Sequence, residues 1–181
     1  FASMSVIFYL IVSLQGASQA QMALNQKIHF TDWVVAHSHL AMLGFATFAA
    51  IGGIVHAWQR IPWARYNARA IEWAYWSLTI GITIMFVDLT IAGLLQAELW
   101  QGGAPWLESV QASRPYWIIR ILSAIPIGGG FVLLLVGITT GPRGGGAAAI
   151  DESLIGKPVA EVMPERVAVS AAVNDRDIRP A

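Results

Sequence analysis

Long apolar runs dominate the first 140 residues and predict helices that cross a membrane. Such a helix needs about 20 mainly apolar residues. Four runs meet this length, at about residues 3–22, 33–58, 72–99 and 116–140. The first is the weakest, because it is interrupted by the polar residues Gln15, Ser18, Gln19 and Gln21. The pattern therefore predicts an all-α fold, a polytopic membrane bundle with four transmembrane helices.

The pattern changes after residue 140. Residues 141–181 open with a glycine-rich stretch and then hold half of the charged residues of the chain. The glycine-rich opening and the mixed polar residues after it are typical of a flexible linker followed by a mostly disordered tail. We therefore expect two parts, a membrane domain over residues 1–140 and a tail over residues 141–181.

Composition supports a membrane protein and excludes several classes of site. Charged residues make up 12% of the chain, about half of what soluble domains carry. The net charge is zero, which gives no general attraction to nucleic acid. The chain has no cysteine, which excludes disulfides, thiolate zinc sites, iron–sulfur clusters and thioether-attached heme.

Basic residues predict the orientation in the membrane. Arg60, Arg65 and Arg69 follow the second run, and Arg143 follows the fourth. The positive-inside rule then places the loop after the second run and the tail in the cytoplasm. The loop over residues 24–32 is predicted to lie outside. The chain starts with Phe1 in an apolar run, and we expect it to be part of something longer.

Two histidines inside the second run are the main candidates for chemistry. His37 and His39 are two residues apart, and an imidazole in a bilayer marks a functional site by default. In a helix these side chains point about 200° apart, so they do not readily chelate one metal. The spacing suits two separate metals, one on each face. Heme fits, because a single imidazole nitrogen ligates its iron.

Small residues flank the pair and offer room for a flat porphyrin. Ala41 and Gly44 lie below His37, and Ala46 and Ala50 lie below His39. The alternative is that the histidines only hydrogen-bond neighbouring helices, with small residues permitting close packing. Spacing alone leaves both interpretations open.

A series of motifs around the pair carries a likeness to a known family. It consists of His29-Phe30-Thr31-Asp32-Trp33, His37-x-His39 and Gly44-Phe45, then Gly52, Arg60, Ala92-Gly93, Trp100, Pro115-Tyr116 and Arg120. These residues resemble the catalytic subunit I of C-type, or cbb-type, heme–copper cytochrome c oxidases; the related nitric oxide reductases share the His-x-His. The likeness covers roughly residues 5–140, the last third of such a subunit.

The resemblance implies a respiratory oxidoreductase of the bacterial inner membrane with two b-type hemes. His37 would ligate the high-spin iron and His39 would be one axial ligand of the low-spin iron. Copper, or another non-heme metal, would be ligated outside this segment. The implied partners are the remaining helices of the catalytic subunit, an electron donor subunit carrying cytochrome c or copper, and lipid. Electrons would pass between the hemes, and oxygen would be reduced to water.

One position departs from the family pattern. Gln15 stands where the cbb-type enzymes usually have a glutamate that delivers protons, and an amide releases no proton. Gln15 is therefore a candidate proton-path position. Either the proton path differs, or the chain is a divergent relative or one that reduces nitric oxide to nitrous oxide, the alternative that Gln15 favours. A structural interpretation is that Gln15 only hydrogen-bonds a neighbouring helix. A second alternative is a non-catalytic diheme b-type cytochrome, and a third is a structural subunit.

Four further polar residues are secondary candidates. Asp88, deep in the third run, is more consistent with a hydrogen-bonded structural acid than with a proton carrier. His56 suits interface anchoring better than ligation. His29, in the outer loop, and Arg120, at the start of the fourth run, suit contact with a heme propionate, but a solvated loop residue and a headgroup contact explain them equally well.

Overall fold

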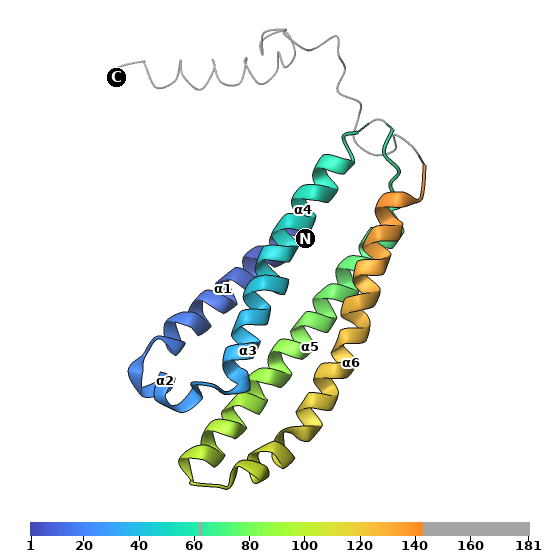
Figure 1. The fold of residues 1–181 in the computed structure, drawn as a ribbon. Coiled ribbons are helices and arrows are strands. Elements are labelled where there is room, and N and C mark those ends of the chain that lie inside the picture. Colours follow the sequence, from blue (N-terminus) through green and yellow to red (C-terminus); the bar gives the residue numbers. More distant parts are fainter. Residues whose placement is uncertain (62, 143–181) are drawn as a thin grey trace, which may run out of the picture. The chain divides into compact units, whose positions relative to one another are not determined.

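The computed structural model describes residues 1–61 and 63–142, and these residues form helices joined by turns and short connecting segments (Figure 1). In chain order the elements are α1 (Ala2–Gln19), α2 (Met22–Ile28), α3 (Asp32–His39), the π-helix η1 (Leu40–Ala46), α4 (Thr47–Trp58), α5 (Ala68–Gln101) and α6 (Trp106–Thr139). The prediction of an all-α membrane bundle is confirmed.

Three helices of the described part are long and apolar enough to cross a membrane. They are Asp32–Trp58, which runs through α3, η1 and α4, and then α5 and α6. The first predicted span corresponds to α1, which has 18 residues and is not among the three. The predicted count of four spans is therefore not confirmed. The predicted tail stays a prediction, because residues 143–181 lie outside the described residues.

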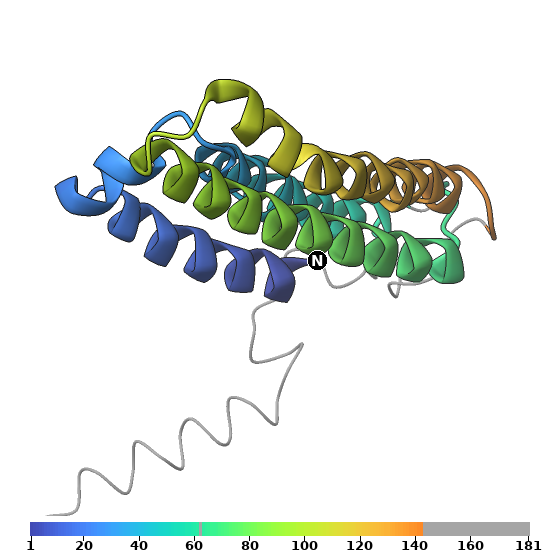
Figure 2. The same ribbon diagram turned by 90° about the horizontal axis from the view of Figure 1, so that it is seen from below.

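Helix α5 is the centre of the bundle. It packs against α3 on one side and α6 on another, while α1 packs against η1 and α4 (Figures 1 and 2). Half of the residues in the most apolar stretch of α5 are buried, against 17% of the residues in the corresponding stretch of α6. The main core lies where α1, α4 and α5 meet, around Phe8, Phe48 and Leu78. The rings of Phe8 and Phe48 meet edge to face at 5.5 Å, a favourable aromatic geometry.

The helix that contains the fourth predicted span begins ten residues before the predicted start of that span. Hydropathy predicts its beginning at Tyr116, but α6 begins at Trp106, directly after Pro105, and Pro115 lies inside it. Hydropathy does not predict the first turns of α6, because Ser109 and Ser113 are polar although they are buried. Proline has no N–H to donate and bends a helix, and the first turns of α6 lie at an angle to the rest in Figure 1.

The predicted outer loop over residues 24–32 also contains a helix. Residues up to Ile28 belong to α2, and a tight turn then leads to Thr31, the N-cap of α3. The Thr31 side chain accepts a hydrogen bond from the Trp33 N–H at 3.3 Å, as expected of a threonine cap. This short connection fixes where the histidine-bearing helix starts.

Candidate functional site

His37 lies in the last turn of α3 and faces α1. Its Nδ1 is 3.3 Å from Oε1 of Gln15. Gly16, the next residue of α1, makes room for the ring, because a Cβ there would lie only 3.0 Å from Cε1 of His37. Helix α1 therefore supplies both a hydrogen-bond partner and the space that the imidazole needs. The structure thus brings Gln15 and His37 together, a contact that spacing along the chain does not reveal.

His39 is held by its own helix. Its Nδ1 is 2.8 Å from the carbonyl oxygen of Val35. A carbonyl only accepts hydrogen bonds, so Nδ1 carries the proton and the lone pair stands on Nε2. His37 adopts the same arrangement when it donates to Oε1 of Gln15. Each ring is therefore oriented through Nδ1 with Nε2 left for a ligand, which is how metal-ligating histidines are usually held.

The small residues near the pair divide into two groups. Gly44 is buried against α1, and a Cβ there would lie 3.0 Å from the Phe8 ring. The prediction that Gly44 leaves room for a porphyrin is therefore wrong, because α1 fills that space. Ala46 and Ala50, below His39, are exposed in the described part of the chain. These two alanines are therefore not covered by described residues, whereas Gly44 is covered by α1.

A π-helix follows the histidine pair directly. Residues Leu40–Ala46 form a full turn and more of this rare conformation, and the Thr47 hydroxyl donates to the Met42 carbonyl at 2.8 Å. π-Helical turns inside α-helices occur frequently at functional sites. They shift the register of every residue that follows, which is why the α-helical faces predicted below His37 and His39 do not hold. Local sequence carries no clear signal for such a turn.

A polar junction joins the start of α3 to α5 and α6. Two donors reach Oδ2 of Asp32, namely Nε2 of Gln96 at 2.7 Å and Nε1 of Trp117 at 2.9 Å. The Asp32 N–H donates in return to Oε1 of Gln96 at 2.7 Å. Gln96 also donates to the Ser113 hydroxyl at 3.1 Å. The sequence pattern does not predict this junction, because its members are up to 85 residues apart.

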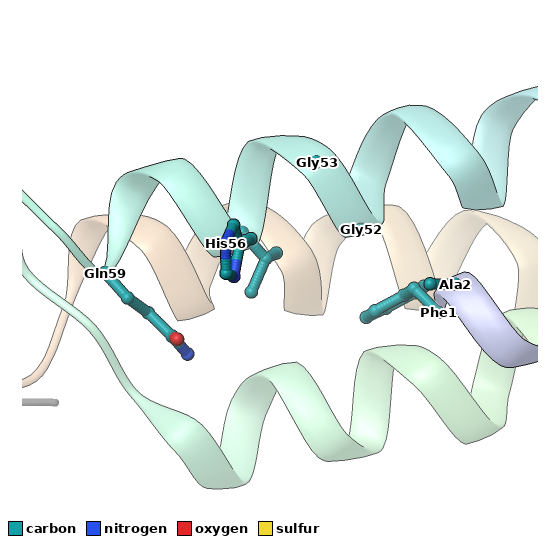
Figure 3. Close-up of a pocket in the computed structure, with 7 residues that line it drawn as sticks. Phe1, Ala2, Gly52, Gly53, His56 and Gln59 are labelled. Atoms are coloured by element: carbon teal, nitrogen blue, oxygen red, sulfur yellow. The ribbon is translucent and has the colours of Figure 1, made fainter. Parts of the chain in front are cut away.

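The two remaining histidines lie apart from the pair. His29 is exposed, and its ring packs on Phe30 with centroids 3.9 Å apart. His56 is bonded through Nε2 by Arg60. It also borders a recess of about 470 Å³ between the start of α1 and α4, which Phe1, Gly52 and Gln59 line as well (Figure 3). The Arg60 contact occupies Nε2, one of the two ring nitrogens through which a histidine ligates a metal.

Asp88 is 6% exposed in α5, and neither carboxylate oxygen has a hydrogen-bond partner among the described residues. The hydrogen bonds expected of a structural acid are therefore not supplied by this part of the chain. Asp88 borders an apolar recess of about 400 Å³ that is also lined by Thr83, Ile84, Val87, Ile91, Tyr116 and Ile119.

Comparison with known proteins identifies the family. Residues 1–126 match the model of the family described as Cytochrome C and Quinol oxidase polypeptide I. The chain belongs to this family. This confirms the resemblance to heme–copper oxidase subunit I.

Individual relatives agree with the family match. A cytochrome c oxidase subunit 1 homolog of Azorhizobium caulinodans is 29% identical over 133 residues, covering 67% of this chain and 24% of the relative. The Cbb3-type cytochrome c oxidase subunit CcoN1 of Stutzerimonas stutzeri is 24% identical, covering 67% of this chain and 28% of the relative. A probable quinol oxidase subunit 1 of Staphylococcus haemolyticus is 24% identical, covering 72% and 19%. The chain thus spans about a quarter of the length of these curated relatives.

The family implies heme and copper, and the described residues fit the two metals differently. Heme iron needs one axial nitrogen from a given side, and His37 and His39 each offer an Nε2 whose ring is oriented through Nδ1. No group of three or more His, Cys, Asp or Glu side chains in the described part could hold a metal ion. The donor set therefore fits heme, and it does not fit a copper site made by these residues alone.

Proposed function

We propose that this chain is the part of a respiratory oxidase catalytic subunit that ligates two heme irons. His37 holds the high-spin iron and His39 holds the low-spin iron. The observation that carries the proposal is the paired orientation of the two imidazoles, each with Nδ1 engaged by an oxygen at 3.3 or 2.8 Å. When bound, the hemes supply electron transfer and, with copper held by other helices, the reduction of oxygen to water.

The residues of this chain bind and orient. His39 donates from Nδ1 to Val35, which keeps the Nε2 lone pair available and the ring at a set angle. His37 is oriented in the same way by Gln15, and Gly16 leaves the space for its ring. A hydrogen bond to Nδ1 also raises the basicity of Nε2 and strengthens its bond to a metal.

Reduction of nitric oxide to nitrous oxide is the second candidate, and Gln15 is the observation that favours it. An amide releases no proton, so Gln15 does not deliver protons as a glutamate would. Its contact with His37 gives it a different role, that of a positioning partner for the ring. Oxygen therefore stays the first candidate substrate, and the identity of the substrate is decided by turnover with each gas.

The assembly that we propose includes the other helices of the catalytic subunit and a subunit that delivers electrons from a cytochrome c or a copper centre. The relatives are about four times as long as the matched segment, and the copper ligands would come from that remainder. Arg60, Arg65 and Arg69 support a cytoplasmic location of the connection between α4 and α5, which is what the positive-inside rule predicts. The histidine pair then lies toward the outer side.

An optical experiment on the purified membrane complex tests the proposal. The reduced spectrum is recorded with and without carbon monoxide, which binds high-spin heme. We expect one heme that responds and one that does not. His37→Ala should remove the carbon monoxide response and spare much of the low-spin signal, while His39→Ala should remove the low-spin signal. Both variants lose the only nitrogen that each iron receives from this helix.

His56→Ala is the matched control, because His56 lies on the same transmembrane segment but bonds Arg60. It should leave both heme signals at the wild-type level. A wild-type complex without heme would refute the proposal, and loss of only the low-spin heme in His37→Ala would reverse the two assignments. Two low-spin hemes with no gas response would instead support a non-catalytic diheme cytochrome. Oxygen and nitric oxide consumption by the wild type then separate the two candidate reactions.

A further inference from the structure

The helix that carries the two histidines is held at its first residue by partly buried hydrogen bonds, which the ligand assignment does not explain. Asp32 is the first residue of α3 and lies five residues before His37, about 7.5 Å along the helix axis. Its carboxylate and its N–H together make three hydrogen bonds to α5 and α6, between 2.7 and 2.9 Å long. We propose that Asp32 is a positioning residue that sets the orientation of His37 and His39 through this junction; the inference rests on the proposed function.

The geometry of the junction is specific. Gln96 both donates to the Asp32 carboxylate and accepts from the Asp32 N–H, each at 2.7 Å. A side-chain amide that closes two bonds to one residue resists both rotation and sliding of that residue. Trp117 reaches the same Oδ2 from α6. Because both donors converge on a single oxygen, α3 is held against two helices at one point.

The junction is rigid on its far side as well. Gln96 is buried, and its remaining N–H donates to the Ser113 hydroxyl. That hydroxyl donates in turn to the Ser109 carbonyl at 2.9 Å. The Ser109 hydroxyl accepts from Nε1 of Trp100 at 2.9 Å. Each of these side chains is therefore held by another, and buried hydrogen-bonded networks of this kind favour a single arrangement. Movement of Asp32 would break several bonds at once.

The same end of α3 has little freedom to move in other ways. The backbone of Trp33 approaches α5 so closely that a Cβ on Gly93 would lie 2.0 Å from its nitrogen. Steric contact and hydrogen bonding therefore locate the first turn of α3 together. A rotation of the first turn of α3 about the helix axis also rotates the side chains one or two turns further along. The junction therefore sets the direction in which both imidazoles point.

Three variants in the purified, heme-loaded complex separate the parts of this proposal. Asp32→Asn keeps one oxygen that can accept both donors but removes the charge. Asp32→Leu removes the acceptor as well. Trp117→Phe keeps the ring volume approximately and removes one N–H donor. Glu98→Gln is the control, because Glu98 lies two residues from Gln96 on α5, is exposed, and takes no part in the junction.

Two measurements report the position of the imidazoles without measuring turnover. The first is the electron paramagnetic resonance spectrum of the oxidised low-spin heme, whose g-values depend on the orientation of the imidazole plane. The second is the rate at which heme passes to an excess of an acceptor protein. We expect Asp32→Leu to shift the g-values and to speed heme release by about tenfold, the lower end of the effect of removing an outer partner of a metal ligand. Trp117→Phe should shift both in the same direction by less.

Asp32→Asn is the rescue variant. It should restore the wild-type g-values and release rate, because the acceptor oxygen is back in place. It should also raise the midpoint potential of the low-spin heme, since a nearby negative charge stabilises the oxidised iron. A general structural defect would instead lower the heme content. It would not combine wild-type g-values with a raised midpoint potential. Glu98→Gln should leave the g-values and the release rate unchanged.

Two results would overturn the inference. One is wild-type g-values and heme release in Asp32→Leu. The other, which decides the matter if Asp32→Leu does not assemble, is wild-type behaviour of Trp117→Phe in both measurements. A wild-type complex that holds no heme would refute the proposed function first, whereas heme that is present but insensitive to these variants would refute only the role of Asp32.

Discussion

Replacing Gly93 by alanine tests the tightest of the contacts that a Cβ added at a described glycine would make. The new Cβ would lie 2.0 Å from the Trp33 nitrogen and 2.7 Å from its Cα. These are backbone atoms, so no side-chain rotation relieves the overlap. Ordinary van der Waals contact begins at 3.4 Å, so α3 and α5 have to separate by roughly 1.4 Å.

The energetic cost follows from the bonds beside the contact. Gln96 lies one turn from Gly93 and bonds Asp32 twice at 2.7 Å. Separation by roughly 1.4 Å stretches both bonds beyond hydrogen-bonding distance. Losing one neutral and one charge-assisted hydrogen bond costs about 3 kcal/mol together. Alanine regains about 1 kcal/mol of helix propensity, so we expect a net loss of about 2 kcal/mol in the free energy of unfolding.

Gly128→Ala is the matched control for this substitution. Gly128 lies within α6, and a Cβ at this position would meet no heavy atom within 4 Å. Alanine should therefore stabilise the helix by about 0.5–1 kcal/mol. Unfolding of the purified complex is followed by circular dichroism during a titration with sodium dodecyl sulfate. If Gly93→Ala unfolds at the same detergent concentration as Gly128→Ala, the close approach of α3 and α5 is wrong.

Two further substitutions test other contacts. In Gly16→Ala the new Cβ lies 3.0 Å from Cε1 of His37, so the ring must shift by a few tenths of an ångström; we expect altered carbon monoxide binding with an unchanged low-spin spectrum, and an unchanged carbon monoxide response would contradict the contact. Asp88→Asn should change the free energy of unfolding by less than about 0.5 kcal/mol, because no described residue donates to the carboxylate; a loss above about 2 kcal/mol in the same detergent titration would reveal an ionic partner from another helix.

The helical class and the candidate ligands follow from the order of residues alone. An apolar run of about 20 residues in a bilayer is expected to form a helix, because a helix hydrogen-bonds its backbone polar groups within the segment. The i and i+2 spacing of His37 and His39 then places them on different faces of that helix. Both inferences need only local geometry, and neither depends on what packs against the helix.

Which helix faces meet is settled by packing between the helices. In a lipid environment the faces that touch a neighbouring helix and those that touch lipid are both apolar, so the hydrophobic pattern does not distinguish them. That is why the pattern predicts that Gly44 faces a porphyrin although it packs on Phe8. The π-helical turn after His39 also moves the residues that follow it to other faces of the helix than an unbroken α-helix predicts.

The polar contacts of the site likewise depend on folding. Asp32 and Gln96 are 64 residues apart, and Gln15 and His37 are 22 apart. In the sequence Gln96 is one more polar residue near the end of an apolar run. Gln96 can bond the helix that carries the histidines only because Gly93, one turn away, lets α3 approach the backbone of α5. A hydrogen bond depends on atoms within about 3 Å, and distance along the chain does not report that separation.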